Sequence, residues 1–189
     1  MRFLGSLLIS TFFMTSLLSA KDVNGVKVVD VVKKEKELKL IGAGTRVKWF
    51  FDVYVMAAYA ENKSCSEKQL ISTDMDKYIS ITMLRDVSAE KMGSALEDTL
   101  GENLDKNSSE KLKSQVKTLR SFFTSDLKRR QVIEFNYIKG KGTKTFVNGE
   151  QVGTTLEGLE FNQLLWKSYF GKKACCKTLK KEVMAACKK

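Results

Sequence analysis

The sequence predicts an α+β fold in which helices lie on one face of an antiparallel sheet. Two helical segments follow one another in the middle of the chain, with strand-like segments before and after them. That order favours a helical layer on one side of a sheet. Short turn signals separate the strand-like segments, so hairpin connections dominate and neighbouring strands are expected to be antiparallel.

The first strands lead into a glycine-rich segment. Asp22–Val32 is expected to form a strand interrupted at Asn24-Gly25, with Glu37–Ile41 as its short partner across a charged turn. We interpret Gly42-Ala43-Gly44 as a turn that needs positive φ. A G-x-G pattern alone is a weak signal for phosphate binding, and no helix follows this one.

The segment Leu40–Glu61 is predicted to contain the central strand, which follows the Gly42-Ala43-Gly44 turn. It is rich in β-branched and aromatic residues, which suit a packed, pleated surface. From Phe50 to Ala60 the residues of both parities are apolar, so we expect both faces of the strand to be covered. Arg46 stands near its start, and a cation beside a long apolar strand indicates a site for a ligand with an apolar body and an anionic head.

The remaining elements follow in order. They are helical turns at Ser66–Ser72, a strand at Tyr78–Leu84, helices at Ser88–Leu104 and Asn107–Phe123, strands at Gln131–Ile138, Thr143–Val147 and Gln151–Leu156, a helix at Leu159–Phe170, and a basic helix in Ala174–Lys189. Helical spacing predicts an inward stripe on the first long helix, made of Met92, Ala95, Leu96, Thr99 and Leu100. Asn148-Gly149 is typical of a two-residue hairpin turn.

The first twenty residues have the features of a secretory signal peptide. Arg2 supplies the charge, Phe3–Leu18 the apolar region and Leu18-Ser19-Ala20 a small-residue cleavage site. We therefore expect a signal peptide at residues 1–20, one domain at residues 21–189, and an exported, periplasmic protein. The alternative is an uncleaved membrane anchor, although the apolar run is short for a span.

Composition excludes several classes of function. The formal net charge is +11, but the lysines are scattered among acidic residues, so we expect a solvated surface and no nucleic-acid partner. The chain has no histidine, which excludes Ser-His-Asp, Cys-His and histidine–zinc chemistries. We expect no metal and no cofactor.

The four cysteines are expected to have a structural role. No C-x-x-C pair occurs, which argues against a thioredoxin-like or zinc-ribbon site. In an oxidising compartment the cysteines can form one or two disulfides. Cys175 and Cys176 are adjacent and poorly placed to pair with each other, which leaves Cys65 and Cys187 as candidate partners. The connectivity stays open at this point.

Several motifs in sequence order resemble the chalcone isomerase-like family, specifically its exported bacterial branch. They are Gly42-Ala43-Gly44-Thr45-Arg46, Phe50-Phe51-Asp52-Val53-Tyr54, Ala58-Tyr59, Leu84-Arg85-Asp86-Val87-Ser88-Ala89-Glu90-Lys91, the Asn148-Gly149 hairpin and the helix that ends at Phe170-Gly171. The resemblance covers nearly the whole mature chain. It implies an open-faced β-sandwich, with a ligand cleft between an antiparallel sheet and a helical layer.

The resemblance also implies two ligand-binding residues. Arg46 matches the arginine that holds an anionic substrate in the plant isomerases and a carboxylate in the fatty-acid-binding relatives. Tyr54 matches the tyrosine that shares this carboxylate in the binding branch, where true isomerases have a threonine. The leading hypothesis is therefore an exported, non-catalytic binder of a fatty acid or similar apolar carboxylate, with Arg46 and Tyr54 as its binding residues and no catalytic residue.

Two other functions are weighed against this hypothesis. The first is a chalcone isomerase-type intramolecular lyase, but the isomerases use a tyrosine and an asparagine where this chain has Ser88 and Ala95. The second is weak association with anionic membranes through the basic helix in Ala174–Lys189.

A ligand head group bound by both Arg46 and Tyr54 sets a geometric condition. Arg46 and Tyr54 would lie about 26 Å apart on one straight strand. We therefore predict a bend or turn between Val47 and Phe51.

Overall fold

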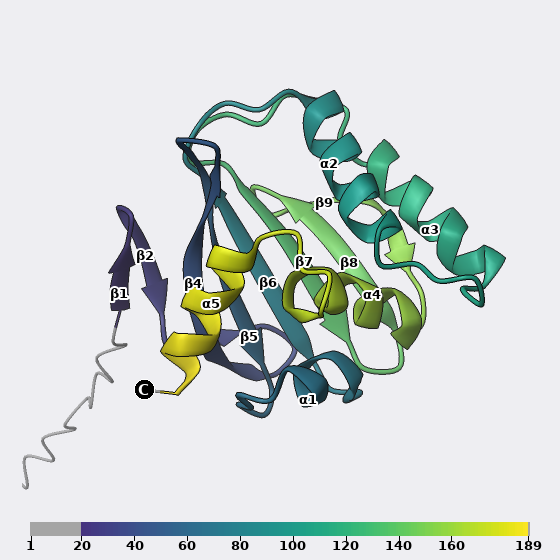
Figure 1. Ribbon diagram of the computed structural model, residues 1–189, viewed down its shortest axis with the longest axis horizontal. Coiled ribbons are helices and arrows are strands. Elements are labelled where there is room, and N and C mark those ends of the chain that lie inside the picture. Colours follow the sequence, from purple (N-terminus) through teal and green to yellow (C-terminus); the bar gives the residue numbers. More distant parts are fainter. Residues whose placement is uncertain (1–19, 189) are drawn as a thin grey trace, which may run out of the picture.

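The centre of the protein is a seven-stranded sheet, seen in a computed structural model that describes residues 20–188 (Figure 1). The strands pair in chain order, each antiparallel to the next. Their bounds are β3 Val31–Lys33, β4 Glu37–Lys48, β5 Phe51–Ala60, β6 Lys77–Met83, β7 Val132–Ile138, β8 Gly142–Val147 and β9 Glu150–Leu156. The predicted α+β class with an antiparallel sheet is confirmed.

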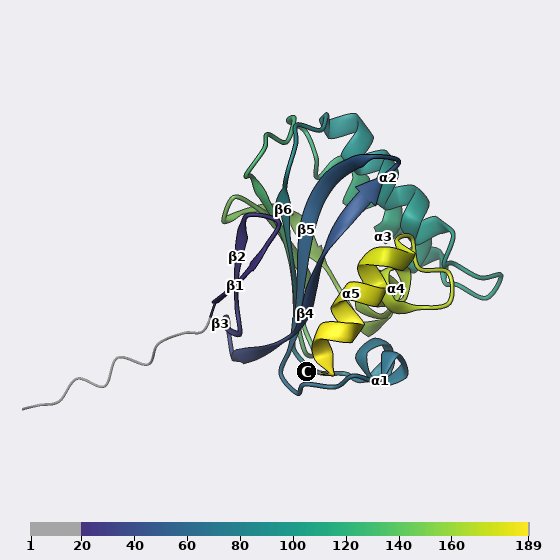
Figure 2. The ribbon, with the colours of Figure 1, turned by 60° about the vertical axis from the view of Figure 1, so that its left-hand side comes forward.

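The helices in residues 20–188 lie on one face of this sheet, as Figure 2 shows. They are α1 Glu67–Ser72, α2 Ala89–Gly101, α3 Glu110–Ser121, α4 Leu159–Phe170 and α5 Lys177–Cys187. Serine side chains cap three of them: Ser66 Oγ accepts from the backbone N–H of Gln69, Ser88 Oγ from that of Lys91, and Ser109 Oγ from that of Leu112. None of the described helices is both long and apolar enough to cross a membrane.

The segment predicted as one central strand is a hairpin of two strands, β4 and β5. A two-residue turn at Trp49-Phe50 joins them, since Lys48 pairs with Phe51 across it. The prediction of one strand is therefore wrong, because the aromatic run at the turn has the composition of a strand. The bend required between Val47 and Phe51 is confirmed.

The predicted turn at Gly42-Ala43-Gly44 is also wrong, because β4 continues through these residues, with an irregularity in its pairing between Leu40 and Gly42. Neither glycine is among the residues with positive φ. A Cβ at Gly42 would lie 2.2 Å from the Val183 carbonyl oxygen, and one at Gly44 would lie 2.7 Å from Glu182 Oε2. These glycines instead let α5 pack directly on β4.

The strand β5 is covered on both faces from Tyr54 onward, as predicted. The same prediction is wrong for Phe50 and Phe51, which are exposed. On the helical side Tyr54, Met56 and Ala58 join the main core. On the other side Val55 and Tyr59 pack in a smaller cluster, to which Val28 contributes. Val28 belongs to a separate hairpin, β1 Ala20–Val23 and β2 Val26–Val29, whose turn is Asn24-Gly25. The interrupted strand expected at Asp22–Val32 is thus this hairpin followed by β3.

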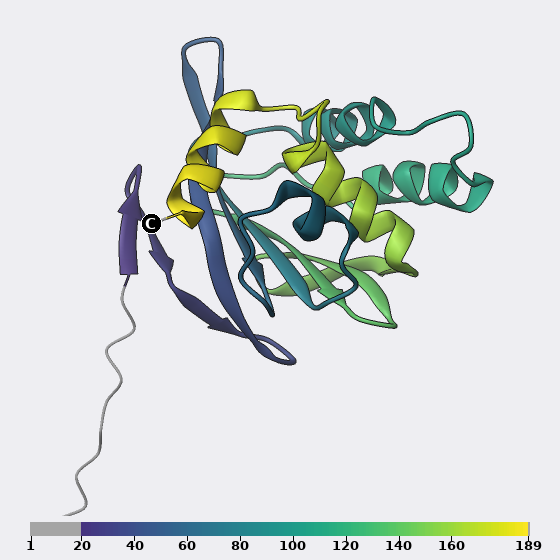
Figure 3. The same ribbon diagram turned by 60° about the horizontal axis from the view of Figure 1, so that its bottom comes forward.

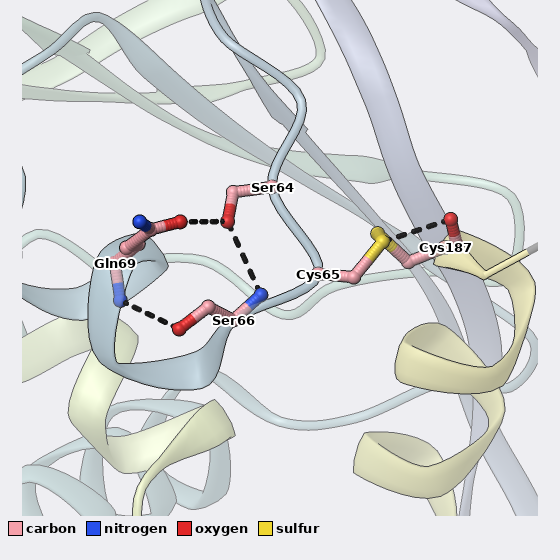
Figure 4. The surroundings of a disulfide bond; sticks show 5 residues. All are labelled: Ser64, Cys65, Ser66, Gln69 and Cys187. Atoms are coloured by element: carbon pink, nitrogen blue, oxygen red, sulfur yellow. Dashed lines mark hydrogen bonds between the residues drawn. A yellow bond between two sulfur atoms is a disulfide. The ribbon is translucent and has the colours of Figure 1, made fainter.

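A disulfide joins Cys65, in the loop before α1, to Cys187 at the end of α5 (Figure 4). Cys175 and Cys176 are free thiols. The loop that holds Cys65 is ordered by local polar contacts, because Ser64 Oγ accepts from the backbone N–H of Ser66 at 3.1 Å. The disulfide therefore fixes the carboxyl end of α5, the helix that covers β4. The predicted signal peptide lies outside the described residues, except for Ala20.

Candidate functional site

The β4–β5 hairpin brings the two predicted binding residues face to face. Arg46 and Tyr54 are direct partners across the antiparallel pair, so their side chains leave the same face of the sheet from Cα atoms about 5 Å apart. The turn at Trp49-Phe50, within the stretch where strand geometry required a bend or turn, is therefore what unites them.

A bulge next to this pair shapes the site. Arg46 pairs with Tyr54 and Val47 pairs with Asp52, which leaves Val53 as an extra residue in β5. Phe51 and Tyr54 are three positions apart, so a regular strand would point them to opposite faces. Because of the bulge, both line the same space.

That space is a cleft of about 480 Å³ between the sheet and the helices. Its walls are mainly apolar, with Ile81 from β6, Met92 and Leu96 from α2, and Tyr169 from α4. Arg46 and Tyr54 both line it. The volume lies within the range of small-molecule sites, about 300–1,000 Å³. The two residues and an apolar chamber therefore form one continuous site.

Arg46 is held in place by the loop between α4 and α5. Its Nη1 donates to the backbone carbonyl of Cys175 at 3.0 Å. No other hydrogen bond from this side chain is formed within residues 20–188, although a guanidinium has five N–H donors. The contact orients the guanidinium and leaves further donors for a ligand.

Tyr54 is buried, and it keeps its proton over the physiological range. Burial raises the pKa of Tyr54 well above 10.0, as do nearby Tyr169, Cys176 and Cys175, while Arg46 opposes the shift. Burial likewise raises the pKa of Tyr169. A phenol in this state is a hydrogen-bond donor and suits a carboxylate oxygen.

The two free thiols lie at the same end of the cleft. Their mutual hydrogen bond raises the pKa of Cys175, as does burial, and the same bond lowers the pKa of Cys176. Both cysteines line the cleft beside Arg46. The sequence marked these two thiols only as cysteines unsuited to pair with each other, and it gave no signal that they face a ligand space.

Further polar residues line the cleft near the hairpin turn. Lys48, Arg85 and Lys91 contribute cations, and Asp86 contributes the acid. Asp86 is already engaged: its Oδ2 lies 3.3 Å from Lys128 Nζ, and its Oδ1 accepts from the backbone N–H of Arg129. This end of the cleft therefore favours an anionic group.

The positions that carry isomerase residues in the family also face the cleft. Ser88 and Ala95, which the family resemblance matches to those positions, both line it. The Ser88 hydroxyl caps α2, and Ala95 offers a methyl group. The predicted inward stripe of α2 thus divides, with Met92, Leu96 and Leu100 buried in the core and Ala95 exposed toward the cleft.

Fold and site together define an open-faced β-sandwich with a ligand-sized cleft between sheet and helices. The chain belongs to the chalcone isomerase-like family, whose model matches residues 20–185. No curated protein sequence matches it significantly. Among solved structures it is similar to a fatty-acid binding protein of Arabidopsis thaliana, with a TM-score of 0.69 and 17% sequence identity over 86% of this chain and 94% of the plant protein. At this identity the likeness shows the fold.

Proposed function

We propose that this protein is an exported, non-catalytic binder of a fatty acid or a similar apolar carboxylate. The observation that carries the proposal is the pairing of Arg46 with Tyr54 at one end of a mainly apolar cleft of about 480 Å³. An anionic head would meet a cation and a phenol there, and an apolar tail would extend between sheet and helices.

The head group would supply orientation and part of the affinity. A guanidinium can bind a carboxylate through two parallel charge-assisted hydrogen bonds, and the Tyr54 hydroxyl can donate a third. Each such bond contributes about 1.5–3 kcal/mol. Because Cys175 already holds the Arg46 guanidinium, little side-chain entropy would be lost on binding.

The hydrocarbon tail would supply the larger share of the affinity. Each methylene removed from water contributes about 0.8 kcal/mol, so a chain of about twelve methylenes or more outweighs the head group. Ile81, Met92 and Leu96 give the apolar wall that such a tail needs. The plant relative of similar fold is a fatty-acid binding protein, which supports the same class of ligand.

The same cleft gives less support to an isomerase. Tyr54 stands where the isomerases have threonine, and Ser88 and Ala95 stand where they have tyrosine and asparagine. Neither a capping serine nor a methyl group replaces those hydrogen-bonding side chains. Binding without chemistry is the function that the residues favour.

Export is part of the proposal and has one structural support. The Cys65–Cys187 disulfide is of the kind that persists in oxidising compartments such as the periplasm. Amino-terminal sequencing of the protein recovered from its host would test this, with Lys21 expected as the first residue. A chain that still begins at Met1 would contradict cleavage.

Titration with a soluble fatty acid tests the binding itself. We expect saturable binding of one molecule per chain, co-purifying acyl chains in native mass spectra, and at least tenfold weaker binding by Arg46→Ala. Lys181→Ala removes an exposed cation of α5 and is the matched control, with no change expected. Non-saturable uptake, or equal affinity in the Arg46 and Lys181 variants, would refute the proposal.

A further inference from the structure

The turn of the β4–β5 hairpin carries a patch of exposed aromatic side chains. Within residues 20–188, the large apolar side chains exposed to solvent all lie here: Val47 is 41% exposed, Trp49 84%, Phe50 96% and Phe51 56%. Figure 3 shows the turn projecting beyond α5 and the rest of the sheet. We call Val47–Phe51 the aromatic tip. Leaving three aromatic rings in water is unfavourable, so the tip has the character of a contact surface.

The backbone of the aromatic tip is strained at Trp49, whose ring is presented to solvent. Trp49 has φ of 59°, a conformation that bulky residues rarely adopt. At the first position of a two-residue hairpin turn, positive φ is normally supplied by glycine. Strain of this kind concentrates where function requires it.

Cations surround the aromatic tip. Lys48 is one of its residues, and the Arg85 guanidinium lies 4.7 Å from the centroid of the Phe51 ring. Of the nearby acids, Asp86 pairs with Lys128, while Asp52 accepts a hydrogen bond from the neutral Asn24 side chain at 2.8 Å, so the cations Lys48 and Arg85 outnumber the acid that has no cationic partner. Exposed aromatics beside free cations complement a bilayer that contains anionic lipids.

The aromatic tip is continuous with the ligand cleft. Trp49 and Phe51 line the cleft with one part of their surface, as Lys48 and Arg85 do. A membrane that covered the tip would therefore lie against the opening through which an acyl chain would enter. A bilayer is also the place where fatty acids concentrate.

The basic helix α5 is a poorer membrane contact. Its apolar residues Leu179, Val183 and Cys187 are buried against the sheet, so its exposed side chains are mainly charged or small. Electrostatic attraction without inserted apolar surface gives weak binding.

We propose that the aromatic tip docks on the surface of an anionic bilayer and that the cleft exchanges its ligand there. The second half of this proposal rests on the proposed function; docking itself does not. Trp49 and Phe50 would enter the headgroup region, where aromatic side chains are favoured. Lys48 and Arg85 would lie near the lipid phosphates.

Tryptophan fluorescence on vesicles tests docking directly. The two tryptophans differ sharply, since Trp49 is 84% exposed and Trp166 is 1% exposed. Vesicles of phosphatidylcholine with about one-third phosphatidylglycerol are therefore expected to shift the emission of Trp49 to the blue. Pure phosphatidylcholine, or 0.5 M salt, should reduce the bound fraction severalfold.

The variant Phe50→Asp separates docking from ligand binding. Phe50 is 96% exposed and does not line the cleft, so its loss should lower vesicle binding at least tenfold and leave fatty-acid affinity in solution unchanged. Asn107→Asp, in the exposed α2–α3 loop at the far side of the molecule, makes the same change of charge and should bind vesicles as the wild type does (Figure 1).

The outcomes distinguish the two proposals. Absence of wild-type binding to the anionic vesicles, equal binding by Phe50→Asp, or self-association through the tip that Phe50→Asp abolishes would each overturn docking. Vesicle binding without saturable fatty-acid binding would uphold docking and refute the proposed function. Saturable binding with transfer from vesicles slowed in Phe50→Asp alone would uphold both.

Discussion

The β4–β5 hairpin has two halves of similar composition and opposite environment. Its inner half, which includes Tyr54 and Met56, is buried beneath the helices. Its tip carries Trp49 and Phe50, which are almost wholly exposed. Apolar residues alone therefore do not decide burial. The difference lies in what packs on each half: α5 and the β1–β2 hairpin cover the inner half, and within residues 20–188 no element covers the tip.

The largest effect on stability is expected from removing the disulfide that anchors α5. Replacing Cys65 and Cys187 by serine opens a link that spans 122 residues, and should lower the free energy of unfolding by about 2–5 kcal/mol. Denaturant titration measures the loss. Cys175→Ser, which breaks no cross-link, should cost less than about 1 kcal/mol. Equal midpoints for the wild type and the double variant would show that α5 needs no anchor.

A smaller effect is expected where α5 touches β4. Gly42→Ala places a methyl group 2.2 Å from the Val183 carbonyl oxygen, so α5 must shift and stability should fall by about 2–3 kcal/mol. Gly101→Ala is the matched control at an open helical position, where a gain of up to about 1 kcal/mol is expected. Similar unfolding curves for the two variants would contradict the close contact.

A buried cation on β6 lies beside the end of β5 opposite the tip, and it makes the free energy of unfolding depend on pH. Lys77 pairs with Ala60 and lies with its ammonium 5.3 Å from the centroid of the Trp166 ring. Burial lowers the pKa of Lys77 to about 8, and the nearby carboxylate of Asp74 partly opposes this shift. Between about pH 8 and 10.5 the unfolded chain binds the extra proton at Lys77, so the contribution of this residue to stability rises with pH there, by an amount on the order of 2 kcal/mol.

Unfolding free energies at pH 7, 8, 9 and 10 would measure this rise. Lys77→Met should remove it, because no ammonium is then buried. The series stops at pH 10, since burial raises the pKa of Tyr59 to about 12 and stability falls once the unfolded tyrosines ionise. The same slope in wild type and variant would assign the pH dependence to other groups.

The smallest effect belongs to the tip. Phe50→Ser should change the free energy of unfolding by less than about 0.5 kcal/mol, because the ring is 96% exposed and buries almost nothing on folding. Thermal unfolding in parallel with Gly42→Ala would compare the two halves directly. A loss above about 1 kcal/mol at Phe50 would mean that the tip is part of the core.

The sequence predicted the fold class and most of the elements because their signals are local. Ser88 and Ser109 cap α2 and α3 at or near the predicted starts of these helices, Ser88 and Asn107. Helix α4 has the predicted bounds Leu159–Phe170. The error at Trp49-Phe50 has a physical cause: aromatic residues favour strands, and only strain places one in a turn with positive φ. The glycines at 42 and 44 were misread because a partner distant in sequence, α5, is what needs them.

The candidate site was only partly predictable. Arg46 and Tyr54 came from the family resemblance, and the requirement of a turn between them came from strand geometry. Nothing local in the sequence showed that Tyr169 faces a cleft shared with Cys175 and Cys176. That arrangement depends on the path of the α4–α5 loop, whose carbonyl at Cys175 holds Arg46.

The central claim is that Arg46 and Tyr54 hold an anionic head group in the cleft. Carbon-13 NMR of a carboxyl-labelled fatty acid, bound to the saturated protein and titrated with acid, tests it most directly. Because a nearby guanidinium favours the charged form, the bound carboxyl should have a pKa at least about one unit lower in the wild type than in Arg46→Ala. Equal pKa values in the two proteins would place the head group elsewhere and contradict the account.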